Sequence, residues 1–209
     1  MNRIIVFALM FFCMTLQIEA QTLSEEEVTA KMYQAFELNK AGKRAEALEL
    51  FLIVGENTKQ QRNEGERQVY VCSQTMACQC YELLGRYQEG YLLGKSLLQG
   101  KLNDEERKDV GHLYALNGYM YACEFIQRDE KGRADYKRGR ELISEILPYS
   151  DGQVKEYAET KIPLSWYFEG AQYAMTQSYD EALSSYEKAL NGFRDLGRVS
   201  EEVDVLSGI

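Results

Sequence analysis

Apolar residues recur at the three- and four-residue spacing of an amphipathic helix along nearly the whole chain after its first stretch. Two of these apolar stripes consist of Ala45, Leu48, Phe51 and Leu52, and of Ala182, Tyr186, Ala189 and Leu190. Residues at this spacing share one face of an α-helix, whereas a half-buried strand alternates apolar and polar residues. No segment shows a clear alternation, so the pattern predicts an all-α fold.

Helix-breaking residues divide this pattern into segments. Glycine adopts the left-handed conformation that often ends a helix, and proline lacks the backbone N–H that a helix interior needs. The predicted breaks fall at Gly42, Gly85, Asn103–Asp104, Gly132, Pro148–Gly152, Pro163 and Gly197. The segments between them predict helices of about 12 to 20 residues joined by short turns, which is typical of a run of helical hairpins.

The segment from 166 to 189 contains a repeat motif. Its small and aromatic residues are Trp166, Gly170, Tyr173, Tyr179, Ala182, Tyr186 and Ala189. This order and spacing resemble the signature of the tetratricopeptide repeat (TPR) family. The chain departs from the family pattern at Glu169, where the family prefers Leu. In such a hairpin, Gly170 would let the two antiparallel helices approach closely, with Ala182 as its small counterpart on the second helix.

Weaker copies of the motif precede this segment. The residues that align with Gly170 are Ala35, Cys78 and Gly118, so successive copies lie 43, 40 and 52 residues apart. The standard TPR unit has about 34 residues, and each unit here is therefore expected to carry longer helices or loops. The resemblance implies a right-handed α-α superhelix, a TPR-like solenoid, over residues 21–209.

The first 20 residues resemble a secretory signal peptide. Arg3 supplies a positive start, an uninterrupted apolar run extends from Ile4 to Met14, and Ala20 offers a small residue at the cleavage position. The run is shorter than the roughly 20 residues of a membrane-spanning helix, although an uncleaved anchor stays an alternative. Lipid attachment at Cys13 is disfavoured by the bulky Phe12 before it. We therefore expect export to the periplasm.

The C-terminal segment predicts a further helix from Ser200, with Glu201 and Glu202 in its first turn. Gly208 lies where the small residue of a fifth repeat would stand, which predicts that the sequence stops within a repeat and lacks a capping helix. The arrangement resembles the exported N-terminal sensor region of bacterial TPR-containing membrane regulators. In that architecture, a membrane span and a cytoplasmic kinase or DNA-binding module would follow Ile209.

Composition narrows the classes of function. The chain has 33 acidic and 24 basic residues and a formal net charge of -9, which disfavours nucleic acid as a partner. It contains 1 histidine and none of the common nucleotide-binding, hydrolase or metalloprotease motifs, so we expect no cofactor, no metal and no enzymatic activity. The acidic runs Glu25–Glu27, Asp104–Glu106 and Glu201–Glu202 are explained by first helical turns.

The cysteines admit two interpretations. Cys72, Cys78, Cys80 and Cys123 would enter an oxidising compartment after export, where a bridge from Cys123 to the Cys72 region is conceivable. Their spacing provides no good local pair, and packing of small residues between helices is the favoured interpretation.

The TPR resemblance implies a binding groove lined by the first helix of each hairpin. Carrying the groove positions onto this chain selects Phe36, Asn39, Lys40, Gln79, Glu82, His112, Tyr119, Tyr167 and Met175. Packing between hairpins is the alternative role for many of them. Phe36, Tyr119 and Tyr167 are the expected anchors for a protein or peptide partner, because aromatic side chains offer large contact areas.

Two functions follow from these expectations. The first is a non-enzymatic periplasmic interaction domain that binds a peptide or protein, as the sensing part of a transmembrane signalling regulator. The alternative is a structural assembly subunit of a cell-envelope complex, which would self-associate through the ends of its solenoid.

Overall fold

The computed structural model describes residues 23–127 and 134–208 of the chain. The expected signal peptide at residues 1–20 and the expected break at Gly132 lie outside these ranges. Within them the backbone forms nine α-helices and one short 3-10 helix, with no strand. The predicted all-α class is therefore confirmed for the described residues.

The helices follow one another with short connections. Their bounds are α2 Glu25–Lys40, α3 Arg44–Thr58, α4 Glu64–Leu83, α5 Tyr87–Leu98, α6 Asp104–Ile126, α7 Tyr136–Ile146, the 3-10 helix η1 Leu147–Tyr149, α8 Gly152–Met175, α9 Tyr179–Asp195 and α10 Val199–Gly208. The longest are α4, α6 and α8, with 20, 23 and 24 residues.

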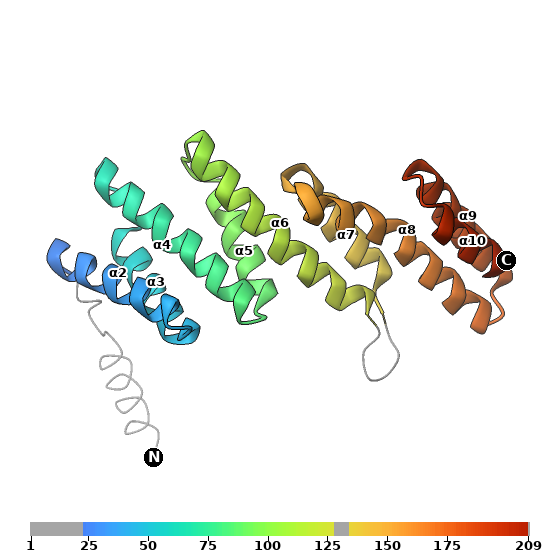
Figure 1. Cartoon of the computed structure of the whole chain (residues 1–209), viewed down its shortest axis with the longest axis horizontal. Helices are drawn as coiled ribbons and strands as arrows, with labels where there is room; N and C mark the ends of the chain where they lie inside the picture. Colours follow the sequence, from blue (N-terminus) through green and yellow to red (C-terminus); the bar gives the residue numbers. More distant parts are fainter. Residues whose placement is uncertain (1–22, 128–133, 209) are drawn as a thin grey trace, which may run out of the picture.

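Neighbours in the sequence are also neighbours in space. Each α-helix packs against the next one, and α4 additionally packs against α6, and α6 against α8. Figure 1 shows the result as an elongated array, with α2 and α3 at one end and α9 and α10 at the other. The main contacts therefore stay local along the array, between helices that are one or two positions apart in the sequence.

Turn residues explain where several helices end. Gly42 follows α2, Gly85 follows α4 and Gly197 follows α9. All three glycines adopt positive φ angles, of 76°, 71° and 67° respectively.

Two further turns contain a glutamine in the left-handed region, Gln61 with φ 48° and Gln177 with φ 62°. The hairpin motif around Gly170 and Ala182 predicts the turn at Gln177. The turn at Gln61, between α3 and α4, is not predicted, because it contains neither glycine nor proline.

The predicted break at Pro163 is wrong, because Pro163 lies inside α8. A proline in a helix interior removes one backbone hydrogen bond and crowds the preceding turn. Here the ring is buried and faces Gly192 of α9, where an added Cβ would lie 2.8 Å from the Pro163 Cβ. Helix α8 therefore continues through Pro163, and the proline ring packs closely against α9.

The core consists of clusters placed in succession along the array. The cluster between α2, α3 and α4 includes Ala35, Phe51 and Cys80, and the cluster around α9 includes Phe193 and Val205. Gly170 of α8 lies against α9 as predicted, since an added Cβ would come within 2.9 Å of the Tyr186 ring and 3.2 Å of the Ala182 carbonyl oxygen.

The three acidic runs lie in first turns of helices, as expected. Ser24 and Glu27 form a capping box at the start of α2, and Asn103 and Glu106 form another at α6. In each box a side-chain oxygen accepts a hydrogen bond from a backbone N–H that the helix leaves free. None of the helices in the described ranges combines the length and the apolar character needed to cross a membrane.

Candidate functional site

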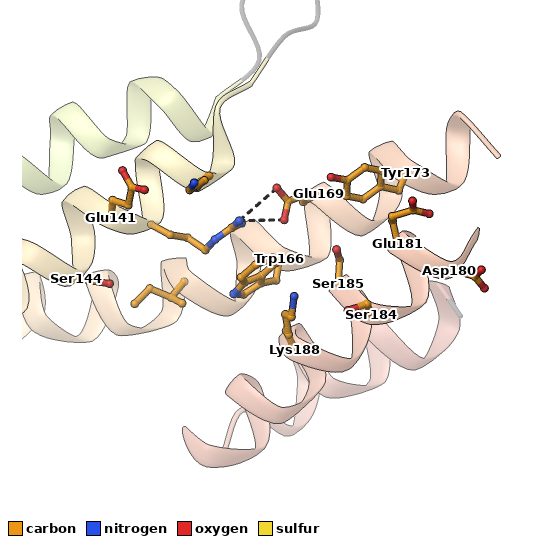
Figure 2. Close-up of a pocket in the computed structure, with 13 residues that line it drawn as sticks. Glu141, Ser144, Trp166, Glu169, Tyr173, Asp180, Glu181, Ser184, Ser185 and Lys188 are labelled. Atoms are coloured by element: carbon orange, nitrogen blue, oxygen red, sulfur yellow. Dashed lines mark hydrogen bonds and ion pairs between the residues drawn. The ribbon is translucent and has the colours of Figure 1, made fainter. Parts of the chain in front are cut away.

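An open groove of about 1070 Å³ lies between α7 and α9 (Figure 2). Helix α8 packs against both of these helices and forms the floor of the groove, while α7 and α9 form its walls. We call this space the α7–α9 groove; it is lined by Lys137, Arg140, Glu141, Ser144, Ile162, Trp166, Glu169, Tyr173, Asp180, Glu181, Ser184, Ser185 and Lys188. Its volume matches the upper end of small-molecule pockets, about 300–1000 Å³, so it has room for several residues of a peptide.

Trp166, the single tryptophan of the chain, contacts a cation from each wall of the groove. The Arg140 Cζ lies 3.4 Å from the centre of the indole ring, and the Lys188 Nζ lies 4.2 Å from it. Both distances are within the range of about 6 Å over which a cation is attracted to an aromatic face. The ring therefore links α7 and α9 through the floor of the groove.

Arg140 also forms a largely buried ion pair with the floor. Its Nη2 lies 3.0 and 3.2 Å from the two carboxylate oxygens of Glu169, and its Nη1 donates to the Ser165 Oγ at 3.3 Å. Burial lowers the pKa of Arg140, and the nearby negative charge of Glu169 opposes this shift. The pair holds the guanidinium in place beside Trp166.

The charges of the groove are separated along α9. Lys188 lies beside Trp166, whereas Asp180 and Glu181 lie toward Tyr173 (Figure 2). The hydroxyl-bearing Ser184 and Ser185 stand between them. One end of the wall therefore presents a positive charge, and the other end presents negative charge.

The space between α5 and α7 is bridged by side chains, in contrast to the α7–α9 groove. The Glu145 carboxylate of α7 accepts hydrogen bonds from the hydroxyls of Tyr114 and Tyr91, at 2.8 and 2.9 Å, and pairs with the Lys95 Nζ at 2.7 Å. Only a smaller cavity of about 280 Å³ is left there. No hydrogen bond or ion pair of the described residues joins α7 directly to α9, so the second space stays open.

The three predicted aromatic anchors are half-buried and lie in three different helices. Phe36 packs edge-on against Phe51 with ring centres 5.4 Å apart. Tyr119 stacks on Tyr157 at 6.3 Å, and Tyr167 lies 5.8 Å from Tyr186. The structure does not bring the three rings together, and each has an aromatic neighbour within the protein.

Four other predicted residues are also spread along the array. Asn39 is half-buried and accepts a hydrogen bond from the Cys80 Sγ, at 3.9 Å, whereas Lys40 is exposed and pairs with Glu37. Met175 is 75% exposed at the end of α8. Burial raises the pKa of the half-buried Glu82 carboxyl, and the charge of Arg44 opposes the shift.

Two predicted residues do meet in one cavity. Gln79 of α4 and His112 of α6 both line a space of about 300 Å³ on another part of the array. The His112 Nδ1 lies 3.0 Å from the Asp151 carboxylate, which precedes α8. This cavity brings together predicted groove residues from two different helices.

The described cysteines pack as small residues rather than as a bridge. Cys78, Cys80 and Cys123 are buried and Cys72 is exposed, and all four are free thiols in the structure. Burial raises the pKa of Cys78 to about 12. Within the described ranges, no three or more His, Cys, Asp or Glu side chains cluster in a way that could hold a metal ion.

The sequence pattern does not predict Arg140 and Lys188 as groove residues, although one signal points toward Arg140. Glu169 is the position at which the repeat motif departs from the family preference, and it is the residue that pairs with Arg140. A carboxylate at a position expected to be apolar indicates a buried cation nearby. Which cation pairs with it could not be deduced, because Arg140 lies 29 residues away in a different helix.

The groove thus combines an aromatic floor, cations, carboxylates and hydroxyls, a set of groups suited to binding a polar segment. Comparisons of the chain with protein-family models, with curated proteins and with solved structures find no match.

Proposed function

We propose that the chain is a non-enzymatic interaction domain that binds a segment of another protein in the α7–α9 groove. The observation that carries this proposal is the open groove of about 1070 Å³ with Trp166 at its floor. Tryptophan and arginine are the residue types most enriched at the energetic centres of protein interfaces. Here they lie in contact within a concave surface, with charged groups on both walls.

We further propose that the helices form TPR-like hairpins stacked as a right-handed superhelix. The four residues that align in the repeat motif support this, because Ala35, Cys78, Gly118 and Gly170 are all buried. The long first helices α4, α6 and α8 account for the surplus length of each unit relative to a standard repeat. The contacts of α6 with both α4 and α8 fit the stacking of successive units.

The apolar N-terminal stretch supports a location in the periplasm, and the resemblance to membrane-bound regulators supports a role as their sensing part. In this proposal a bound protein or peptide is the signal. The net charge of -9 disfavours nucleic acid as the ligand.

Selection of peptides tests the proposal. A library of random peptides is panned against the immobilised chain, and the retained peptides are titrated while the fluorescence of Trp166, the sole tryptophan, is recorded. We expect the emission of Trp166 to change on binding. Lys188→Glu should abolish the binding of most retained peptides, whereas Lys43→Glu, at the exposed α2–α3 turn, should leave it unchanged.

Retained peptides that bind the Lys188→Glu variant as tightly as the wild type would place the binding surface elsewhere. In that case the cavity that contains Gln79 and His112 is the next surface to test.

The alternative function, a structural assembly subunit of a cell-envelope complex, is favoured by one observation. Helix α10 exposes Val203 and Leu206 with 56% and 51% of their surface accessible, which offers an apolar face for a second copy.

A further inference from the structure

We propose that the α7–α9 groove selects an extended peptide segment that carries one acidic and one basic side chain about three residues apart. This inference rests on the proposed binding function and specifies its ligand. It comes from the separation of charge along α9.

The positive end of the groove has a cation available for a ligand. Among the described residues, the Glu169 carboxylate of the floor pairs with Arg140, and no carboxylate pairs with Lys188. The Lys188 side chain is exposed and lies over the Trp166 ring. An acidic side chain placed there would meet Lys188 directly and would also lie near the Arg140 guanidinium.

Toward Tyr173, the α9 wall of the groove has carboxylates available for a ligand, while Lys137 lines the opposite, α7 wall. Asp180 and Glu181 are exposed in the first turn of α9, and neither pairs with a cation of the described residues. Tyr173 lies next to them and offers an aromatic surface on the same side (Figure 2). A basic side chain can therefore pair with these carboxylates while its aliphatic part packs on the tyrosine ring.

The distance between the two ends determines the spacing of the ligand charges. Glu181 and Lys188 are seven residues apart on one helix, which corresponds to about 10.5 Å at a rise of about 1.5 Å per residue. A peptide in the polyproline II conformation covers about this distance in three residues, at about 3.1 Å each, and its three-residue turn brings the two charged side chains to the same face. The peptide backbone between the two charges would then pass Ser184 and Ser185, which line the groove between them.

A panel of synthetic peptides tests this selectivity on the full chain. The peptides share a short neutral sequence of Ala, Ser and Leu and differ at two positions three residues apart: Glu with Lys, Lys with Glu, Glu with Glu, Lys with Lys, and Gln with Gln. Binding is followed by Trp166 fluorescence at low salt. One or both of the mixed-charge peptides should bind about fivefold or more tightly than the other three, and added salt should reduce the difference.

Two protein variants show whether the selectivity arises at the stated residues. Lys188→Gln should remove the preference for the mixed-charge peptides over the peptide with two Lys residues, and Glu181→Gln should reduce the preference for them over the peptide with two Glu residues. Both replaced side chains are exposed, so folding should be preserved, which a thermal melt verifies. Lys43→Gln serves as the matched control and should change neither preference.

Equal binding of mixed-charge and neutral peptides would overturn the inference and leave the proposed function intact, provided that panned peptides still bind in the groove. Tighter binding of the peptide with two Glu residues would also overturn it, since the groove would then select negative charge alone. If neither the panel nor any panned peptide binds, both the inference and the proposed function fail.

Discussion

Gly170 permits a close approach of α8 and α9 that a larger residue would prevent. An added Cβ at this position would lie 2.9 Å from two carbons of the Tyr186 ring, a ring that is itself buried. Glycine is therefore required at this position because there is no space for a side chain. Its backbone has the usual helical conformation, unlike that of the turn glycines.

Gly170→Leu should lower the free energy of unfolding by about 1–3 kcal/mol, because the added side chain overpacks the contact with Tyr186. Thermal or urea unfolding followed by circular dichroism measures the change. Gly65→Ala is the matched control: Gly65 is exposed in the first turn of α4, so alanine there should leave stability unchanged or raise it by up to about 1 kcal/mol. A Gly170→Leu variant as stable as the wild type would contradict the packing described here.

The Arg140–Glu169 pair is the second feature at the scale of residues. The side chains of these two residues are 10% and 17% exposed, so each charge depends on the other for compensation. Removing one partner of such a pair leaves a poorly solvated charge, whereas replacing both by apolar groups costs much less.

Glu169→Leu should destabilise the protein by on the order of 2 kcal/mol, although leucine is the residue that the family pattern prefers at this position. The double variant Arg140→Met with Glu169→Leu should recover most of that loss. Urea unfolding of the two single variants and the double variant measures the coupling between the residues. Additive effects of the two substitutions would show that the pair contributes no coupling energy.

At the scale of elements, Glu145 joins three helices. Its carboxylate on α7 binds the Tyr91 hydroxyl and Lys95 of α5 and the Tyr114 hydroxyl of α6. Burial raises the pKa of Glu145, but the hydrogen bonds from Lys95, Tyr114 and Tyr91 together lower the pKa by more than burial raises it. The pKa of Glu145 therefore lies below its usual value of 4.5.

Acid should therefore weaken the connection between α5, α6 and α7. Above pH 4.5 the Glu145 carboxylate is charged in the folded and unfolded chains alike, and its contribution to stability is fully present. As the pH falls below 4.5, the unfolded chain binds the proton first, so this contribution is lost progressively down through the lowered folded pKa. Melting temperatures measured from pH 7 to pH 3 should fall less steeply for Glu145→Gln than for the wild type. Parallel curves would contradict this role of Glu145.

Helix α8 shows how tertiary contacts can outweigh a local signal. Pro163 indicates a break when the sequence is considered alone, yet α8 continues through it for 24 residues in total. The contact with Gly192 buries the proline ring against α9, and Gly192 has no side chain that would obstruct it. The same helix thereby reaches far enough to place both Trp166 and Tyr173 in the groove.

At the scale of the whole molecule, the array has an apolar surface at its α10 end. Val199, Val203 and Leu206 are all more than half exposed, whereas Val205 of the same helix is buried against the α9 cluster. One face of α10 thus belongs to the core, and the other is available for association.

The isolated chain should therefore associate as its concentration rises. Sedimentation or light scattering should show a mass above that of the monomer for the wild type, and a monomer for Val203→Lys combined with Leu206→Lys. Leu92→Lys combined with Leu183→Lys, at exposed apolar positions on α5 and α9, is the control and should not change the association. A wild-type chain that is monomeric at every concentration would refute association through α10.

The local features of this protein follow from short-range patterns in its sequence. Apolar residues at three- and four-residue spacing predicted the helices, and Gly42, Gly85 and Gly197 predicted turns that the structure confirms. The contact of Gly170 with α9 was also predicted, because the motif around it joins two helices that are adjacent in the sequence. Such features depend on residues within one turn or one hairpin, where spacing along the chain translates directly into position.

The position of the α7–α9 groove follows from tertiary contacts that the sequence pattern does not reveal. The approach of Arg140 and Lys188 to Trp166 joins α7, α8 and α9, and the closure of the α5–α7 space by Glu145 joins α5 and α6 to α7. Likewise, the buried ring of Pro163 within α8 packs against Gly192 in the next helix. These contacts depend on how far each helix extends and how it crosses its neighbours, because packed side chains from separate segments set both quantities together. The spacing of apolar residues within one segment therefore does not predict how its helix crosses its neighbours.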